Sequence, residues 1–229
     1  MNLVGISYNF NFFTKNNSIK ADSESIYKLM PFINDGFMPT TADEISEEGD
    51  RYKVIRVQKE NADVNISITF AKKAILVQIT KEKEIEAVNL MGLVSSTFAK
   101  LRETLGEIKG ERAACIANAI IENDQETEER IYKKFFTDEP SYFEWSVRRA
   151  NKFVIEGEES NCVLAVNKGL GTKQYNGTGS ISQIEVIVVS CDNNTIAENN
   201  TPRFEVNNTT IFNELLNKTK QDLDKIIGD

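Results

Sequence analysis

The stretch LVGISYNFNFF at residues 3–13 alternates apolar side chains with small or polar ones. Its apolar members fall on one side of an extended chain: Val4, Ile6, Tyr8, Phe10 and Phe12. This period of two residues is typical of a half-buried β-strand. Because the strand must bury that side against another layer, the stretch predicts a sheet with a covered face.

The residues from there to 107 predict a helix, three strands and a second helix. Asp22 or Ser23 caps a helix that ends at Gly36, and residues 39–50 are acidic and unpatterned, which favours a loop. Strands are predicted at 52–58, 64–70 and 74–80, joined by short turns. An apolar stripe from Ala87 to Leu105 predicts a long helix. The order is β-α-β-β-β-α.

Residues 108–229 run through the same order of elements again. A strand is predicted at 112–121, a helix at 126–136, three strands at 142–155, 162–166 and 184–189, and a terminal helix after Asn208. We therefore expect an α+β fold of two successive β-α-β-β-β-α units, residues 1–107 and 108–229. In each unit, helices would cover one face of an antiparallel sheet and leave the other face uncovered.

The composition limits the classes of partner. The 229 residues include 27 Lys and Arg against 35 Asp and Glu, a net charge of -8, which argues against nucleic-acid binding. The first residues lack the features of a secretory signal, and no apolar run approaches the ~18 residues that span a bilayer. We expect a cytoplasmic protein without a membrane segment. Cys115, Cys162 and Cys191 have no CxxC spacing and are interpreted as buried reduced thiols.

The chain contains no histidine. Ser-His-Asp and Cys-His catalytic sets and the common zinc sites are therefore excluded. Metal sites made of carboxylates alone, and catalysis by Lys or Tyr, remain open. The tripeptide Glu107-Ile108-Lys109 matches the Glu-x-Lys of a restriction-type nuclease, but it follows a predicted helix instead of lying in a strand, which favours a charged turn. No cofactor is expected.

A glycine-rich connection is predicted between the strands at 162–166 and 184–189. It contains Lys168, Gly169, Gly171 and Lys173 and extends to Gly179. Such a loop can wrap a phosphate through its backbone N–H groups. The Walker spacing is missing, however, and the connection leads into a strand, which favours a mobile hairpin. Among the loops, it is the first candidate for contact with a ligand or partner.

The predicted strand at 142–155 offers a second candidate site. Trp145 and its apolar neighbours share one side of this strand and are interpreted as core. Tyr142, Glu144 and Arg148 lie on the other side. If that face of the sheet is uncovered, these three side chains would form a polar recognition surface.

Two stretches carry a resemblance to known proteins: the run Arg112-Ala113-Ala114-Cys115-Ile116-Ala117-Asn118, with the helix before it, and the closing strand and helix from Val186 to Ile227. In layout the chain resembles a sporadically distributed family of uncharacterised bacterial proteins of about this length. That family usually has an Arg-x-x-Leu-Arg-Tyr-x-Asn-like strand and a Pro-Leu-x-Glu-Val opening. This chain has Arg112 and Asn118 but lacks the second Arg, the Tyr and the opening. Because the family has no assigned activity, the resemblance implies no catalytic residues.

Two hypotheses for function follow. The first is a noncatalytic binding or interaction protein in a bacterial or phage conflict system, which engages another protein, a second copy of itself or a small ligand on a sheet face. The abundance of Asn, Lys and Ile, typical of AT-rich bacterial and phage genomes, suggests that setting. The alternative is a metal-dependent hydrolase or nuclease that uses carboxylates such as Glu107, Glu111 and Glu144.

Overall fold

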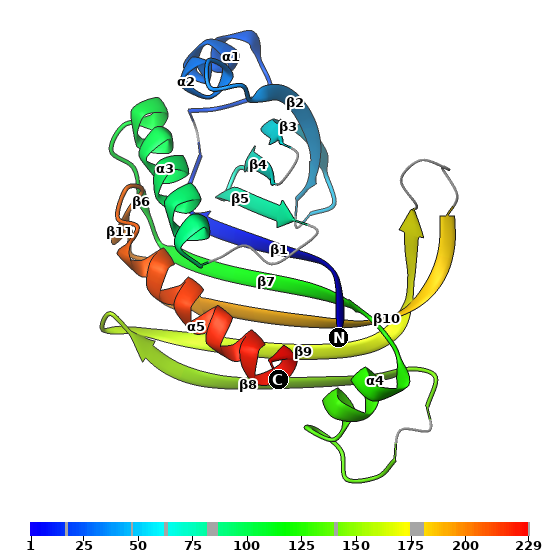
Figure 1. Cartoon of the computed structure of the whole chain (residues 1–229). Coiled ribbons are helices and arrows are strands. Elements are labelled where there is room, and N and C mark those ends of the chain that lie inside the picture. The colour runs from blue at the N-terminus through cyan, green and yellow to red at the C-terminus, as the bar shows by residue number, and fades with distance from the viewer. Residues whose placement is uncertain are drawn as a thin grey trace.

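The computed structural model describes residues 1–16, 18–46, 48–61, 64–81, 87–139, 142–174 and 181–228. Its main feature is a nine-stranded antiparallel sheet in the order β2-β3-β4-β5-β1-β7-β10-β9-β8 (Figure 1). Its strands are β1 (Asn2–Phe13), β2 (Met38–Ile45), β3 (Arg51–Glu60), β4 (Asn65–Phe70), β5 (Ala74–Lys81), β7 (Arg112–Glu122), β8 (Trp145–Ile155), β9 (Glu158–Gln174) and β10 (Ile181–Thr195). β6 (Lys109–Gly110) and β11 (Phe204–Glu205) form a separate two-stranded sheet.

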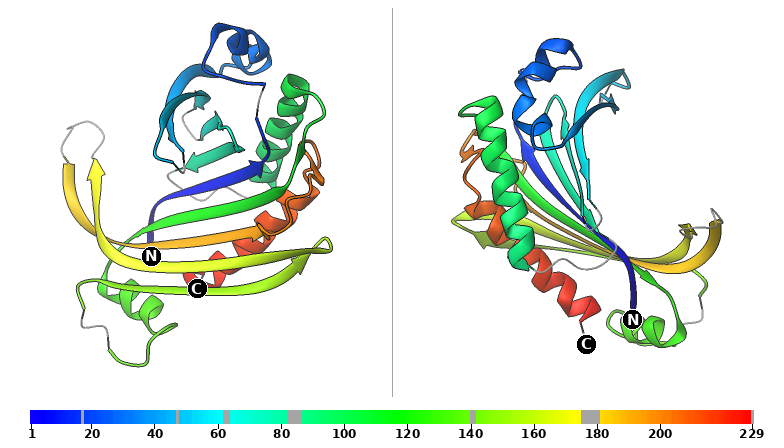
Figure 2. Two further views of the ribbon diagram at one scale, coloured as in Figure 1. Left: turned by 180° about the vertical axis from the view of Figure 1, so that it is seen from behind. Right: turned by 45° about the horizontal axis from the view of Figure 1, so that its top comes forward.

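The described helices pack on one side of the large sheet. They are α1 (Ser23–Lys28), α2 (Met30–Ile33), α3 (Ala87–Leu105), α4 (Gln125–Tyr132) and α5 (Thr210–Ile227). Phe98 of α3 packs edge to face on Phe12 of β1, with ring centroids 6.5 Å apart, and Tyr132 of α4 packs on Trp145 of β8 at 5.4 Å. The sheet is curved, and α3 and α5 lie on its convex side (Figure 2).

The strand predicted at residues 3–13 is confirmed as β1, and its alternation separates two faces. Ile6, Tyr8, Phe10 and Phe12 are each at most 2% exposed. The ring of Phe10 lies 6.1 Å from that of Phe212 in α5. Burial of one such apolar side chain contributes roughly 1.5–3 kcal/mol. This side of β1 therefore holds the centre of the core against the helices.

The α+β class, with a helix-covered sheet in each of two β-α-β-β-β-α units, is wrong. The strands of both halves join in one sheet, because β1 pairs with β5 along one edge and with β7 along the other. Strand accounts for 48% of the chain and helix for 26%. The fold is therefore mostly one large antiparallel sheet. Alternation in β1 shows which residues face the core, but it does not show which strands lie beside it.

Several predicted boundaries also differ from the structure. Part of the acidic segment at residues 39–50, predicted as a loop, belongs to β2, an edge strand with no buried residue and hence no apolar alternation. Residues 169–174 of the predicted glycine-rich connection belong to β9, while residues 175–180 lie outside the described part of the chain. The strand predicted from residue 142 begins at Trp145, and the helix predicted to residue 136 ends at Tyr132.

The division into residues 1–107 and 108–229 stays a prediction. The boundary falls between the end of α3 and β6, just after Gly106, whose φ of +74° suits a helix terminus. At the centre of the sheet β1 and β7 pair across this boundary, with Phe10 opposite Cys115. Away from this pair the strands follow in the order β5, β4, β3 on one side and β10, β9, β8 on the other.

Candidate functional site

The face of the sheet opposite the helices is covered by no described helix, and we call it the open face. It is the concave side of the curved sheet (Figure 2). Ser7, Asn9 and Asn11 of β1 point to it, because they alternate with the buried residues of that strand. Each of the three is partly exposed. The open face is therefore accessible along its central strand.

Uncharged polar side chains gather at the centre of the open face. Neighbouring strands bring them into register: Asn9 lies opposite Gln78 of β5, and Ser7 opposite Asn118 of β7, which in turn lies opposite Ser190 of β10. We call this group the central polar patch. Its members are Ser7, Asn9, Asn11, Gln78, Thr80, Asn118, Ser190 and Asn194.

Charged side chains lie mainly toward the margins of the open face. By alternation along β3 and β8, Arg56 and Arg148 point to it near opposite edges of the sheet. On β10, Asp192 lies between the patch members Ser190 and Asn194 and on the same face, and its carboxylate accepts a hydrogen bond from Asn194 Nδ2 at 2.8 Å. Ile120 adds an apolar side chain that is 39% exposed. The centre thus carries the single acid Asp192 among uncharged polar side chains, while Arg56 and Arg148 lie on the two flanks.

The polar groups of the patch are largely uncommitted. Within the described residues, the side chains of Asn9, Asn11, Gln78 and Asn118 form no hydrogen bond to another part of the chain. A carboxamide has an NH2 group that donates and an oxygen that accepts, so each of these side chains can donate a hydrogen bond to a partner or accept one from it. The arrangement can therefore recognise polar groups, above all peptide amides, mainly through uncharged side chains.

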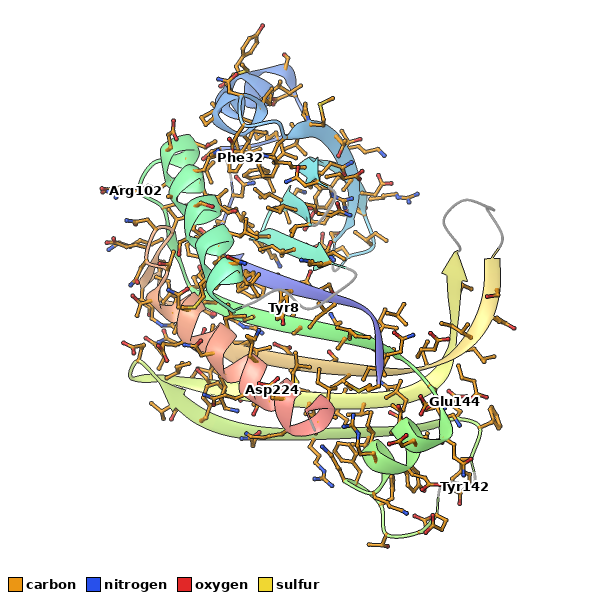
Figure 3. All side chains as sticks on the ribbon, viewed as in Figure 1. Tyr8, Phe32, Arg102, Tyr142, Glu144 and Asp224 are labelled. Atoms are coloured by element: carbon orange, nitrogen blue, oxygen red, sulfur yellow. The ribbon has the colours of Figure 1, made fainter. Side chains whose placement is uncertain are left out.

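Three predicted site residues belong to β8 or the segment before it. Arg148 lies on the open face and is exposed, as the alternation of its strand predicts. Tyr142 and Glu144 are also exposed, but they precede β8 and lie beside α4 (Figure 3). The structure therefore brings Arg148 to the open face and leaves the other two at the end of the sheet. Their role in binding stays a prediction.

The four residues of the predicted glycine-rich connection all belong to β9. Lys168 faces the helix side of the sheet and is 7% exposed, whereas Gly169 and Gly171 face the opposite side. A Cβ atom at Gly171 would come within 3.1 Å of Val186 Cγ1, so glycine permits close packing there. Lys173 pairs with Ser182 through the backbone. As strand residues, these positions do not form the phosphate-wrapping loop considered above.

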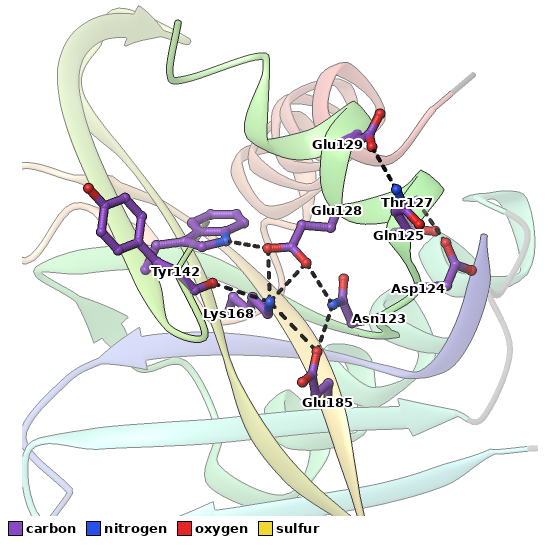
Figure 4. Close-up of polar contacts among 10 residues, drawn as sticks. Asn123, Asp124, Gln125, Thr127, Glu128, Glu129, Tyr142, Lys168 and Glu185 are labelled. Carbon is purple, nitrogen blue, oxygen red and sulfur yellow. Dashed lines mark hydrogen bonds and ion pairs between the residues drawn. The ribbon is translucent and has the colours of Figure 1, made fainter. Parts of the chain in front are cut away.

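Lys168 instead belongs to a buried polar cluster beneath α4 (Figure 4). Its Nζ donates to both carboxylate oxygens of Glu128, at 2.8 and 2.9 Å. Trp145 Nε1 and Asn123 Nδ2 also donate to Glu128, each at 3.2 Å. Burial alone would raise the pKa of Glu128, but these hydrogen bonds outweigh it and hold the pKa below its usual value. Because every contact is internal, the cluster fastens α4 to the sheet.

The carboxylates proposed for metal binding are not assembled. Glu107 pairs with Arg102 at 2.9 Å just after α3, while Glu144 lies beside α4. The backbone N–H of Glu111, next to β7, donates a hydrogen bond to the carbonyl oxygen of Phe13 at 2.8 Å. In the described part of the chain, no three His, Cys, Asp or Glu residues are grouped so that they could hold a metal ion.

The prediction of buried reduced thiols is confirmed. Cys115, Cys162 and Cys191 are free and buried, on the helix side of β7, β9 and β10. Burial raises the pKa of Cys115 and Cys191 to about 12 and that of Cys162 to about 11. At neutral pH these groups are thiols, which are poor nucleophiles.

The central polar patch was not predicted, although part of its signal lies in the opening stretch. Between the apolar residues that mark the core, β1 places Ser7, Asn9 and Asn11 on its second side. The alternation that identifies the core also identifies this row. The contributions of Gln78, Asn118 and Ser190 depend on the order of the strands, which alternation leaves open.

No protein-family model matches the chain, and a comparison with curated proteins gives no match. The resemblance of Arg112–Asn118 and Val186–Ile227 to a bacterial family therefore stays a prediction. None of the described helices has the length and apolar character needed to cross a bilayer.

Proposed function

We propose that the chain is a noncatalytic binding protein that engages another protein on the open face. The observation that carries this proposal is the charge-poor centre of a concave sheet face that no described helix covers. Cores of protein interfaces are depleted in charged residues, and their rims are polar and accessible. The central polar patch, flanked by Arg56 and Arg148, follows that distribution.

The chemistry of the patch favours a protein over a polyanion. Asn and Gln side chains can donate to peptide carbonyls and accept from peptide N–H groups. A nucleic-acid surface would instead need Lys and Arg at its centre to neutralise phosphates. The charged residue within the patch is the acid Asp192, between Ser190 and Asn194. The net charge of -8 further opposes a nucleic acid.

The cellular compartment and biological context of the protein are also proposed. Three free cysteines support a reducing compartment, and we place the protein in the cytoplasm. A bacterial or phage conflict system is the proposed context. A second copy of the chain is the alternative occupant of the open face, and light scattering of the purified protein distinguishes it from a different partner.

Two Asn→Asp substitutions test the proposal with little change in shape. The variant N9D/N118D places two charges in the central polar patch, where both side chains are partly exposed. The control N34D/N200D adds the same charge at exposed positions away from this patch. The wild type and both variants should melt at similar temperatures, because none of these side chains is buried.

Binding is measured by purifying the tagged chain from its native cell and then titrating the isolated partner by calorimetry. We expect N9D/N118D to bind at least about tenfold more weakly, since an unpaired charge in an interface core must lose its hydration. The control should bind like the wild type. Equal affinity of N9D/N118D and the wild type would refute the open face as the binding surface.

A further inference from the structure

A pocket lies where the segment after β1 passes the start of β3 and the end of β4. It is open to solvent and has a volume of about 350 Å³, within the range of small-molecule sites, which is roughly 300–1,000 Å³. Its lining residues are Asn16, Ile19, Lys20, Tyr52, Lys53, Val54, Phe70 and Lys72. None of them belongs to the central polar patch, so any ligand of this pocket is independent of the proposed protein partner.

The floor of the pocket is apolar and rigid. Ile19 and Phe70 are 3% and 1% exposed and belong to the hydrophobic core, which fixes their positions. Phe70 is held from the helix side by Phe32, with ring centroids 6.5 Å apart. Such a floor can bury the apolar body of a ligand without reorganising, which reduces the cost of binding.

The charged side chains that line the pocket are all basic, in a chain of net charge -8. Lys53 is paired with Asp43 at 2.7 Å. Lys20 and Lys72, by contrast, form no ion pair within the described residues. Lys72 Nζ lies over the ring of Tyr52, 3.6 Å from its centroid, so its position is defined. Two ammonium groups are thus available for an anion.

Tyr52 does not add a negative charge to this site. Burial and a hydrogen bond with Glu44 raise the pKa of Tyr52 to about 12. The Glu44 carboxylate also accepts from the backbone N–H of Lys72, at 3.2 Å, and is not part of the lining. At neutral pH the lining therefore combines an aromatic ring, an apolar floor and lysine ammonium groups.

We propose that this pocket binds a small amphipathic anion: a compound with a flat apolar body and one carboxylate, sulfonate or phosphate group. The apolar body packs on Ile19 and Phe70. The anionic group is bound by Lys20 and Lys72 at the rim. The pocket needs both the lysines and the apolar floor, because hydrated lysines alone bind anions weakly and the apolar floor alone does not select a charged ligand.

The probe for the test is 1-anilinonaphthalene-8-sulfonate, an aromatic sulfonate whose fluorescence rises on binding. Its neutral counterpart, N-phenyl-1-naphthylamine, lacks the sulfonate. The variant K20Q/K72Q removes the two lysine charges, and K109Q/K133Q removes the same charge from exposed lysines elsewhere. Melting temperatures of all three proteins establish that each is folded.

The wild type should bind the sulfonate probe at one saturable site. K20Q/K72Q should weaken that binding by about tenfold, the loss expected for charge-assisted hydrogen bonds, while K109Q/K133Q leaves it unchanged. Binding of the neutral probe should not respond to either variant. Non-saturable binding of the sulfonate, or equal affinity in the two variants, would overturn the proposal.

Competition experiments distinguish the contribution of the ligand's apolar body from that of its anionic group. Benzoate should displace the sulfonate probe at a lower concentration than inorganic phosphate, because benzoate also has an apolar ring to bury. Displacement by phosphate at the same concentration as by benzoate would overturn the role of the apolar floor.

Discussion

Replacement of Lys168 by Met should lower the free energy of unfolding by about 3 kcal/mol at pH 7. Lys168 Nζ donates to both oxygens of Glu128, and the two side chains are 7% and 13% exposed. Removing one partner of a buried ion pair usually costs about 3–5 kcal/mol, because the other charge is left unpaired. Trp145 and Asn123 still donate to Glu128, which places the expected loss at the lower end of this range.

The loss of unfolding free energy caused by Lys168→Met should become smaller as the pH falls. The pKa of Glu128 in the folded wild type lies below the ordinary 4.5, so its stabilising contribution is present above that value and disappears as the pH falls through the folded pKa. In K168M the cation is absent and burial raises the pKa of Glu128, so its carboxyl becomes neutral on mild acidification. The difference in stability between the two proteins should therefore be smaller at ~pH 4 than at pH 7.

Urea denaturation at both pH values measures these differences. The control K28M removes a lysine from the exposed pair Lys28–Glu24 and should change stability by less than about 0.5 kcal/mol. The double variant E128L/K168M should recover most of the loss, since neither charge remains unpaired. A loss below about 1 kcal/mol at pH 7, or one equal at both pH values, would refute the role given to this buried pair.

Two further predictions concern packing and thiol reactivity. Gly110→Ala should destabilise the protein by about 1–3 kcal/mol in thermal unfolding, because its Cβ would lie 2.7 Å from Phe12 Cε2 and 2.9 Å from the carbonyl oxygen of Phe13. Gly92→Ala in α3 meets nothing within 4 Å and should be neutral or stabilising, and a larger loss at position 92 than at 110 would contradict this explanation. The cysteines should resist a thiol reagent at pH 8 in the native protein and react fully in denaturant, since burial raises their pKa values. Fast reaction of the native protein would show that Cys162, the least shifted of them, is accessible.

Much of the secondary structure could be predicted because each element carries its own pattern. The alternation of β1 and the apolar stripe of α3 both reflect burial of one side, and both elements were found close to the expected bounds. β2 gives no such signal, since none of its residues is buried and it contains Pro39. Gly169 and Gly171 suggested a loop because glycine is uncommon in strands, yet β9 accommodates both.

The arrangement of the sheet could not be predicted in the same way. The pairing of β1 with β7 joins segments separated by about 100 residues along the chain, and nothing in either strand specifies the other. The central polar patch depends on that pairing. The alternation of β1 contains enough signal to mark Ser7, Asn9 and Asn11 as facing away from the core, but it cannot show that Asn118 and Ser190 lie beside them.

The central position of β1 also constrains how the chain can fold. Tyr8 pairs with Ile79 of β5 on one side and with Ala117 of β7 on the other. During synthesis β1 can pair with β5 early, but its second edge stays open until β7 has emerged. Closing such long loops carries an entropic cost that slows folding. Until then an apolar strand edge is exposed to pairing with other chains, so the interval between β5 and β7 is the stage at which aggregation should compete with folding.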